Sequence, residues 1–146
     1  MKKSVRSGAI GQTRPSKRHK IFTLEEAGRA LPLVRRIVGD LVEQYRLLQR
    51  LEKERKLVGQ LGHPEEKRAT DARGHAAAAR LAELIDEVTS IGCDIKDLEK
   101  GLVDFPAMHE GRRIELCWML GEERVEWWHE TTSGFAGRRR VEGTLV

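Results

Sequence analysis

The chain has 146 residues, of which 39% are hydrophobic and 34% are charged, so it can bury the core of one domain of ordinary size. Its apolar runs fall short of the ~20 residues that a membrane-spanning helix needs, and the basic N-terminus is not followed by the apolar segment of a secretory signal. We therefore expect a cytoplasmic protein.

The positive charge belongs to the N-terminal segment. The net charge is +4, but the first 20 residues carry seven Lys and Arg and no acid, which leaves 20 basic against 23 acidic residues. Residues 1–20 also contain Ser, Gly, Thr and Pro, and they cannot bury enough surface to offset the entropy of ordering. We expect a disordered basic tail over 1–20 and a single domain over 21–146.

Residues 22–91 predict a long antiparallel helical hairpin. Thr23 can cap a first helix in a capping box with Glu26. Pro32 cannot donate to the Gly28 carbonyl, which predicts a short N-terminal helix over 24–30, kinked or broken before a longer one. A loop over Gly59–His63 then leads to a second helix from Pro64 to Ile91, ended by Gly92.

Apolar residues repeat at alternating steps of three and four in both helices, as in a coiled coil. Folding the chain back about Leu61 makes the two stripes face each other: Leu31 with Ile91, Val34 with Val88, Val38 with Leu84, Leu41 with Leu81, Tyr45 with Ala77, and Leu48 with Gly74. The outer faces are rich in charge, which is typical of a solvated surface. Leu47 and Leu51 are expected on this outside, where they could pair two copies into a homodimer.

Residues 92–140 predict a small antiparallel β-sheet of three or four strands, so the fold class is α+β. Ile91, Cys93 and Ile95 alternate with polar residues, and a strand is expected from Leu102 to Phe105, before Pro106. One face of the sheet should pack on the helices near their Leu31 and Ile91 ends.

The strongest strand signal is a hairpin that joins Arg113–Met119 to Arg124–Glu130 around Gly121 and Glu122. Alternation predicts one apolar face with three facing pairs: Trp118 with Val125, Leu116 with Trp127, and Ile114 with His129.

Several short motifs occur along the chain in the order and spacing of a known family, which the chain therefore resembles. They are Phe22-Thr23-Leu24-Glu25-Glu26-Ala27, Gly101-Leu102-Val103-Asp104-Phe105-Pro106, Leu116-Cys117-Trp118, Gly121-Glu122, Trp128-His129-Glu130 and Gly134-Phe135-Ala136-Gly137-Arg138. From Phe22 to about Arg138 the chain resembles the bacterial family called "domain of unknown function two-two-zero-three". The resemblance implies no activity, so it assigns no functional residues. Thr132 and Ser133 stand where members often carry an acidic residue.

Asp104, His129 and Glu130 are the candidate metal-ligating or catalytic residues, because His and carboxylates are common ligands of divalent metals. Asp104 could reach the strand that carries His129, whereas His129 and Glu130 are adjacent and point to opposite faces unless the strand bulges or ends there. The alternatives are an ion network of Asp104 with Glu130, Arg113 and Arg138, or a structural role for His129 capping an aromatic core.

The two cysteines, Cys93 and Cys117, match neither a disulfide framework nor a zinc-ligand spacing, and we interpret them as small buried residues.

Three functional hypotheses follow. The first is a non-enzymatic binding or scaffolding protein with a protein partner, which presents a surface around Asp104, His129, Glu130, Phe135 and Arg138. The second is a small metal-dependent enzyme centred on Asp104, His129 and Glu130. The third is nucleic-acid binding through residues 1–20 and Arg138–Arg140, by contacts to phosphates.

Overall fold

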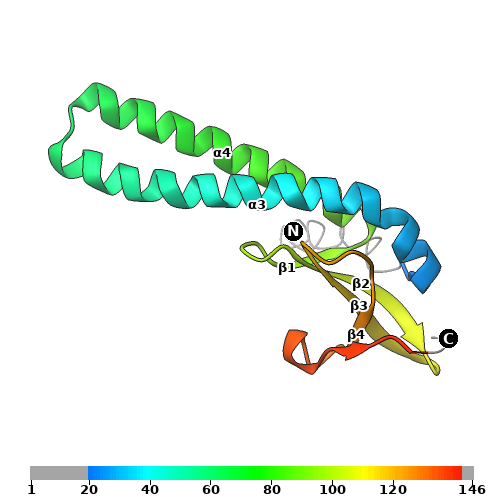
Figure 1. Cartoon of the computed structure of the whole chain (residues 1–146). Helices are drawn as coiled ribbons and strands as arrows, with labels where there is room; N and C mark the ends of the chain where they lie inside the picture. The colour runs from blue at the N-terminus through cyan, green and yellow to red at the C-terminus, as the bar shows by residue number, and fades with distance from the viewer. Residues whose placement is uncertain (1–19, 143–146) are drawn as a thin grey trace, which may run out of the picture.

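The computed structural model describes residues 20–142 and has the expected α+β architecture, in which two long helices are followed by an antiparallel sheet (Figure 1). The elements are α3 (Leu24–Leu61), α4 (Pro64–Ile91), β1 (Asp94–Asp97), β2 (Leu102–His109), β3 (Arg112–Met119), β4 (Trp127–Glu130), η1 (Phe135–Gly137) and β5 (Arg139–Arg140). The predicted basic tail, apart from Lys20, lies outside the described residues. In the part of the chain that is described, no helix is both long and apolar enough to cross a membrane.

The first helix begins as its capping residues predict but does not break at Pro32. The Thr23 hydroxyl accepts from the Glu26 amide at 3.0 Å, and the Glu26 carboxylate accepts from the Thr23 amide at 2.9 Å. α3 continues through Pro32 to Leu61, so a separate short helix over 24–30 is wrong. Pro32 leaves the Gly28 carbonyl without its helical hydrogen bond, and Gly28 is an exposed residue, so water can satisfy that carbonyl. The first turns of α3 bend away from its main axis (Figure 1).

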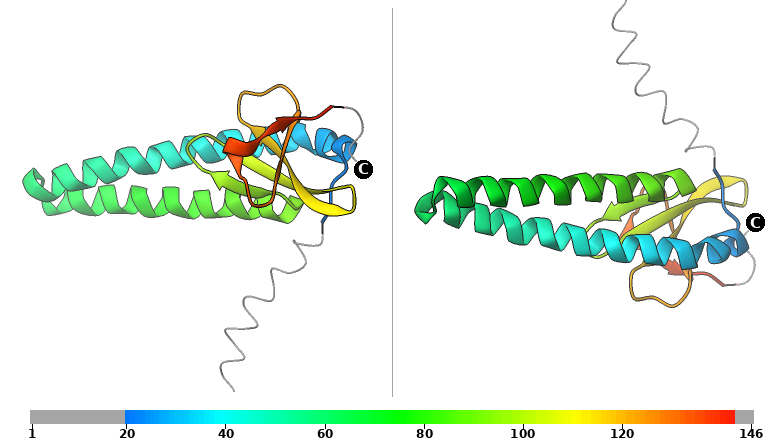
Figure 2. Two further views of the ribbon diagram at one scale, coloured as in Figure 1. Left: turned by 90° about the horizontal axis from the view of Figure 1, so that it is seen from below. Right: turned by 90° about the horizontal axis from the view of Figure 1, so that it is seen from above.

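The second helix has the predicted bounds, and Gly92 ends it with a left-handed φ of 112°. The predicted stripes of the two helices form the buried side of the hairpin. The hairpin extends well beyond the sheet, which lies against only the end where α3 begins and α4 stops (Figure 2). Phe22 marks this junction, because its ring packs edge-on against Phe105 of β2 at 5.1 Å.

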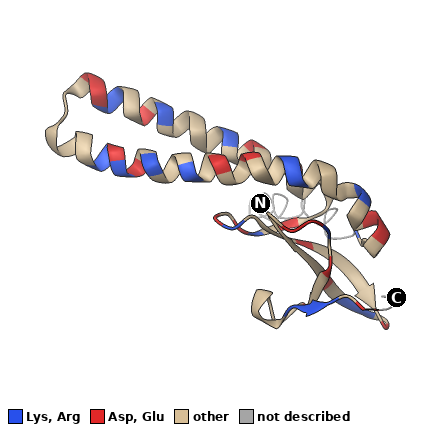
Figure 3. Ribbon diagram, viewed as in Figure 1, with Lys and Arg blue, Asp and Glu red and all other residues tan. Residues whose placement is uncertain are grey.

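Charged residues cover the outside of the hairpin, as predicted (Figure 3). Several form surface ion pairs, including Arg55 with Glu52 at 2.9 Å and Arg73 with Glu54 at 3.1 Å. Exposed pairs of this kind contribute ~0–1 kcal/mol each. This face therefore keeps the hairpin solvated rather than holding it together.

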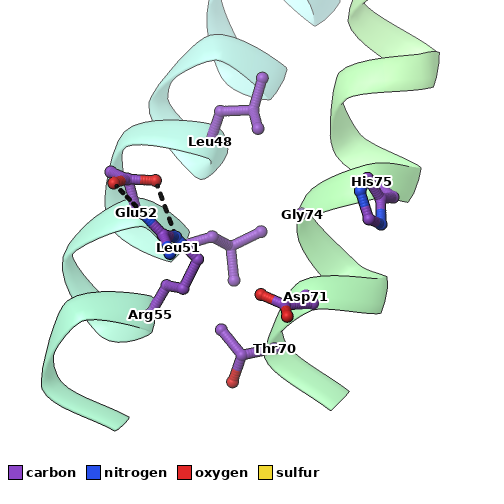
Figure 4. Close-up of a pocket in the computed structure, with 8 residues that line it drawn as sticks. All are labelled: Leu48, Leu51, Glu52, Arg55, Thr70, Asp71, Gly74 and His75. Carbon is purple, nitrogen blue, oxygen red and sulfur yellow. Dashed lines mark hydrogen bonds and ion pairs between the residues drawn. The ribbon is translucent and has the colours of Figure 1, made fainter. Parts of the chain in front are cut away.

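Toward its distal loop the hairpin opens into a cavity of about 350 Å³ between the two helices (Figure 4). Leu48 of α3 and Gly74 of α4 both line it, in agreement with their predicted pairing. Leu51 also lies in this interior and is buried, while Leu47 is half-buried. The prediction that Leu51 lies on an outer pairing surface is therefore wrong.

The sheet has five strands in the order β1-β2-β3-β4-β5 rather than three or four, because Arg139–Arg140 adds a short last strand. β2 also continues past its predicted end at Phe105 to His109. Since β1 pairs β2 only as far as Asp104, Pro106 lies where β2 has become an edge strand, and proline is tolerated at edges.

The hairpin of β3 and β4 is present, but its predicted register is wrong by one residue. Leu116 pairs with Trp128 rather than Trp127, and His129 pairs with Glu115 rather than Ile114. The connection is a loop over residues 120–126 instead of a tight turn, with the Trp118 indole N–H bonded to the Glu122 carbonyl at 2.9 Å. A loop of this length does not impose the register of a two-residue turn.

Gly101 offers a test of how the sheet is joined to the helices. A Cβ at Gly101 would lie 2.8 Å from the Leu120 Cβ and 3.0 Å from Val38 of α3, whereas a Cβ at Gly121 would meet nothing within 4 Å. Both glycines have positive φ, 71° and 107°.

We expect Gly121→Ala to lower the free energy of unfolding by about 1–2 kcal/mol from the backbone conformation alone. Gly101→Ala should lower it by about 1–3 kcal/mol more, because it also overpacks the junction. Urea unfolding of the two variants measures the difference, and equal losses would contradict this junction.

Candidate functional site

The two faces of the sheet have different surroundings. Val103, Phe105 and Leu116 point to the inner face and join the core of the helices. Because side chains alternate along a strand, the outer face receives Asp104, Glu115, Cys117 and His129. All four are nonetheless buried, with exposed fractions of 2%, 7%, 0% and 3% respectively. The outer face of the sheet therefore also carries buried side chains, and these buried side chains are polar.

Three of these side chains form one cluster. His129 Nε2 lies 3.1 Å from Asp104 Oδ2. A ligand-type atom from each of Asp104, Cys117 and His129 lies within 4.8 Å of those of the other two. The contact between Asp104 and His129 is the one that the sequence suggested, while Cys117 occupies the place expected for Glu130.

The ring of His129 is held by both of its nitrogen atoms. Nδ1 lies 2.7 Å from the backbone oxygen of Glu130, which can only accept, so Nδ1 carries a proton and donates. Nε2 therefore faces Asp104, with one proton between the two side chains. In a nucleophilic triad the histidine would bond the carboxylate with one nitrogen and the thiol with the other. This connectivity, together with the burial of Cys117, is not that of a cysteine nucleophile.

The cluster borders a pocket of about 320 Å³ on the outer face. Asp104, Glu115 and His129 line it together with residues of β1 and of the segment that follows β4: Lys96, Asp97, Leu102, Thr131, Gly134 and Phe135. Two buried carboxylate oxygens, Asp104 Oδ1 and Glu115 Oε1, have no hydrogen-bond partner within residues 20–142. A buried acceptor without a partner costs roughly 1–3 kcal/mol, more when it is charged.

Burial also raises the pKa values of the acidic groups in this cluster. It raises the pKa of Asp104, although the charge of His129 opposes the shift. It raises the pKa of Glu115, where Arg113 opposes the shift and the Asp104 carboxylate adds to it. The Cys117 thiol has its pKa raised to about 12, first by burial and then by the negative charge of Asp104. Asp104, Glu115 and Cys117 therefore all have raised pKa values in one small polar cluster.

Glu130 does not join the cluster. It pairs with Arg112 through two hydrogen bonds of 3.2 and 2.7 Å, and this pairing holds the pKa of Glu130 below its ordinary value. Its neighbour His129 points to the opposite side, as expected for adjacent strand residues. The suggested ion network of Asp104, Glu130, Arg113 and Arg138 does not form, because Arg113 pairs with Glu115 and Arg138 pairs with Glu122.

Phe135 lines the pocket from the segment after β4, and Arg138 contacts Phe135 from the same segment. Phe135 lines the pocket but remains 39% exposed. The Arg138 guanidinium lies 4.7 Å from the ring centres of both Phe135 and Trp127 and donates to Glu122 at 2.7 Å. Arg139 stacks on Trp128, and Arg140 stacks on Trp127 and pairs with Glu126. These arginines hold the C-terminal strand on the sheet.

Sequence reasoning missed Glu115 and Cys117 as members of the site. Both alternate with the apolar residues of β3, so their shared face was predictable. The register error placed His129 opposite Ile114 on the other face and so separated it from them.

The stability of the protein at different pH values tests the buried state of Glu115. Since the pKa of Glu115 in the folded protein is above its ordinary value of 4.5, its favourable contribution to stability is complete below that pH and is lost as the pH rises through the folded pKa. We expect metal-free wild type to lose stability relative to Glu115→Gln between pH 4 and 7.

Glu130→Gln is the opposite control, because the lowered pKa of Glu130 stabilises the folded protein above pH 4.5. Wild type should gain stability relative to this variant over the same range. Urea unfolding at the two pH values measures both differences, and the same sign for both variants would contradict the assignment.

A family model described as "Uncharacterized conserved protein (DUF2203)" matches residues 20–141. No curated protein and no solved structure matches the chain. The family description states no activity, so it assigns no role to any residue of the pocket. Since the match spans nearly the whole described chain, the protein belongs to the DUF2203 family of uncharacterised conserved proteins.

Proposed function

We propose that the protein is a non-enzymatic binding protein that recognises a cationic or hydrogen-bond-donating group in the pocket on the outer face of its sheet. The observation that carries this proposal is the pair of buried carboxylate oxygens, Asp104 Oδ1 and Glu115 Oε1, that lack partners within the described chain and belong to residues lining one pocket. A ligand that donates to them would remove the cost of leaving them unpaired.

The size and construction of the pocket support binding. A cavity of about 320 Å³ is within the range of small-molecule sites, which span roughly 300–1,000 Å³. Leu102 and Phe135 supply apolar wall, while Asp104, Glu115 and His129 supply convergent polar groups. The floor belongs to paired strands anchored on the helical hairpin, so these groups are held before a ligand arrives.

The other two hypotheses have less support from the described residues. A metal-dependent enzyme that uses Glu130 would need that carboxylate to leave Arg112 and turn to the opposite side of its strand. Nucleic-acid binding by Arg138–Arg140 would have to compete with aromatic rings and with Glu122 and Glu126 for the guanidinium groups.

A thermal-shift panel tests the binding proposal. The probes are guanidinium and alkylamine compounds and the chloride salts of Mg²⁺, Ca²⁺, Mn²⁺ and Zn²⁺. We expect at least one probe to raise the Tm of wild type with increasing concentration, because a ligand that binds only the folded state adds about 2.7 kcal/mol at 100 times its Kd.

Asp104→Asn and Glu115→Gln should lose more than half of that shift at the same concentration. Asp71→Asn is the matched control, because Asp71 lines the separate cavity of the helical hairpin. A panel that leaves the wild-type Tm unchanged, or a shift that persists in Asp104→Asn, would overturn the proposal.

A further inference from the structure

We infer that Asp104, Cys117 and His129 form a site for a divalent transition metal, best suited to Zn²⁺. This inference rests on the proposed function and names the class of ligand that the outer-face pocket takes. It places Cys117, and not Glu130, beside Asp104 and His129 as the third ligand. Three strands supply the three ligands: β2, β3 and β4.

The spacing of the cluster fits a tetrahedral ion. Zinc lies about 2.0–2.3 Å from nitrogen, oxygen and sulfur ligands, so neighbouring ligand atoms are separated by ~3.3–3.8 Å. The 3.1 Å between His129 Nε2 and Asp104 Oδ2 is close to this range, and all three ligand atoms lie within 4.8 Å of one another.

His129 is already oriented as a metal ligand. Histidines that bind metals commonly donate their second ring N–H to a backbone carbonyl or a carboxylate, which fixes the tautomer and the ring plane. Here Nδ1 donates to the Glu130 carbonyl at 2.7 Å, and Nε2 is directed at the cluster. The strand backbone thus provides the supporting hydrogen bond.

The two carboxylate oxygens without partners are a second, independent observation that points to a ligand at the cluster. Asp104 Oδ1 belongs to a ligand of the cluster, and Glu115 Oε1 belongs to the residue paired with His129 across β3 and β4. Three protein ligands leave a fourth position on zinc, which Glu115 or a solvent oxygen from the pocket can occupy. Sulfur, nitrogen and oxygen ligands together favour zinc over magnesium or calcium, which prefer oxygen alone.

The charge balance of binding is simple. The ion displaces the thiol proton of Cys117 and the single proton held between His129 and Asp104, and both protons pass to solvent. One doubly charged cation therefore replaces two protons, and the charge of the buried cluster is unchanged.

Cobalt substitution tests the inference on the full chain after chelator treatment and dialysis. We expect Co²⁺ to bind at one equivalent per chain and to produce the near-ultraviolet charge-transfer band of a thiolate–cobalt bond. Zn²⁺ should displace the cobalt and remove the band. Competition with a chromophoric chelator then gives the Zn²⁺ affinity of each variant.

Cys117→Ser should abolish the band and, like His129→Gln, weaken Zn²⁺ binding by more than about tenfold. Cys93→Ser is the matched control, because Cys93 is the other buried cysteine and lies outside the cluster. It should keep both the band and the affinity. Circular dichroism of each variant shows whether it is folded, and the wild-type spectrum remains decisive if a variant does not fold.

Absence of the thiolate band in wild type, or a band that survives in Cys117→Ser, would overturn the metal site. Equal Zn²⁺ affinity in wild type and His129→Gln would do the same and would indicate adventitious binding elsewhere. If Co²⁺ and Zn²⁺ fail while an organic cation still raises the Tm in an Asp104-dependent manner, the metal inference falls and the binding proposal stands. If neither class of ligand acts, both fall.

Discussion

The pairing of β3 with β4 is the constraint on which the rest of this structure depends. With Glu115 opposite His129, the face of the sheet that points away from the helices holds Asp104, Glu115, Cys117 and His129 together. The same pairing sends Leu116, Trp118 and Trp128 into the core. A slip of β4 by one residue would exchange Trp128 and His129 between the two faces, so it would expose aromatic surface and bury a histidine against the helices.

The buried polar residues on the outer face cost stability, and a bound ligand would remove that cost. A sheet packed on helices through one face usually carries solvated polar residues on the other. Here those polar residues are buried beside a pocket that residues of β1 and of the segment after β4 also line, and two carboxylate oxygens are left unpaired within residues 20–142. Apolar residues of similar size would avoid this cost. We therefore interpret the buried acids, thiol and imidazole as groups that contact a ligand.

The helical hairpin was largely predictable from sequence because local rules govern it. Thr23 with Glu26 fixed its start, and Pro64 with Gly92 fixed the second helix. Pro32 does not break the first helix as one of the two predicted outcomes required, because the packing of Leu31 and Val34 holds the helix on both sides of the proline. The prediction for Leu51 was wrong because its side chain lines the cavity near the hairpin's loop. Leu51 lies beyond Leu48, the last residue of the predicted apolar repeat in the first helix.

The site was only half predictable. The contact of Asp104 with His129 followed from the order of strands, but Glu115 and Cys117 required the register, which a loop over residues 120–126 does not encode locally. The ion pair of Glu130 with Arg112 likewise depends on which side of β4 each residue occupies. Predicting the complete site would thus have required the register between strands that are far apart in sequence.

The most direct measurement of this register is the set of nuclear Overhauser contacts made by the His129 ring in the folded, metal-free protein. The structure predicts contacts from the ring protons to the β-protons of Asp104 and Cys117. Contacts from the ring to the Ile114 methyl groups, without those to Cys117, would contradict the register and remove the basis of the pocket.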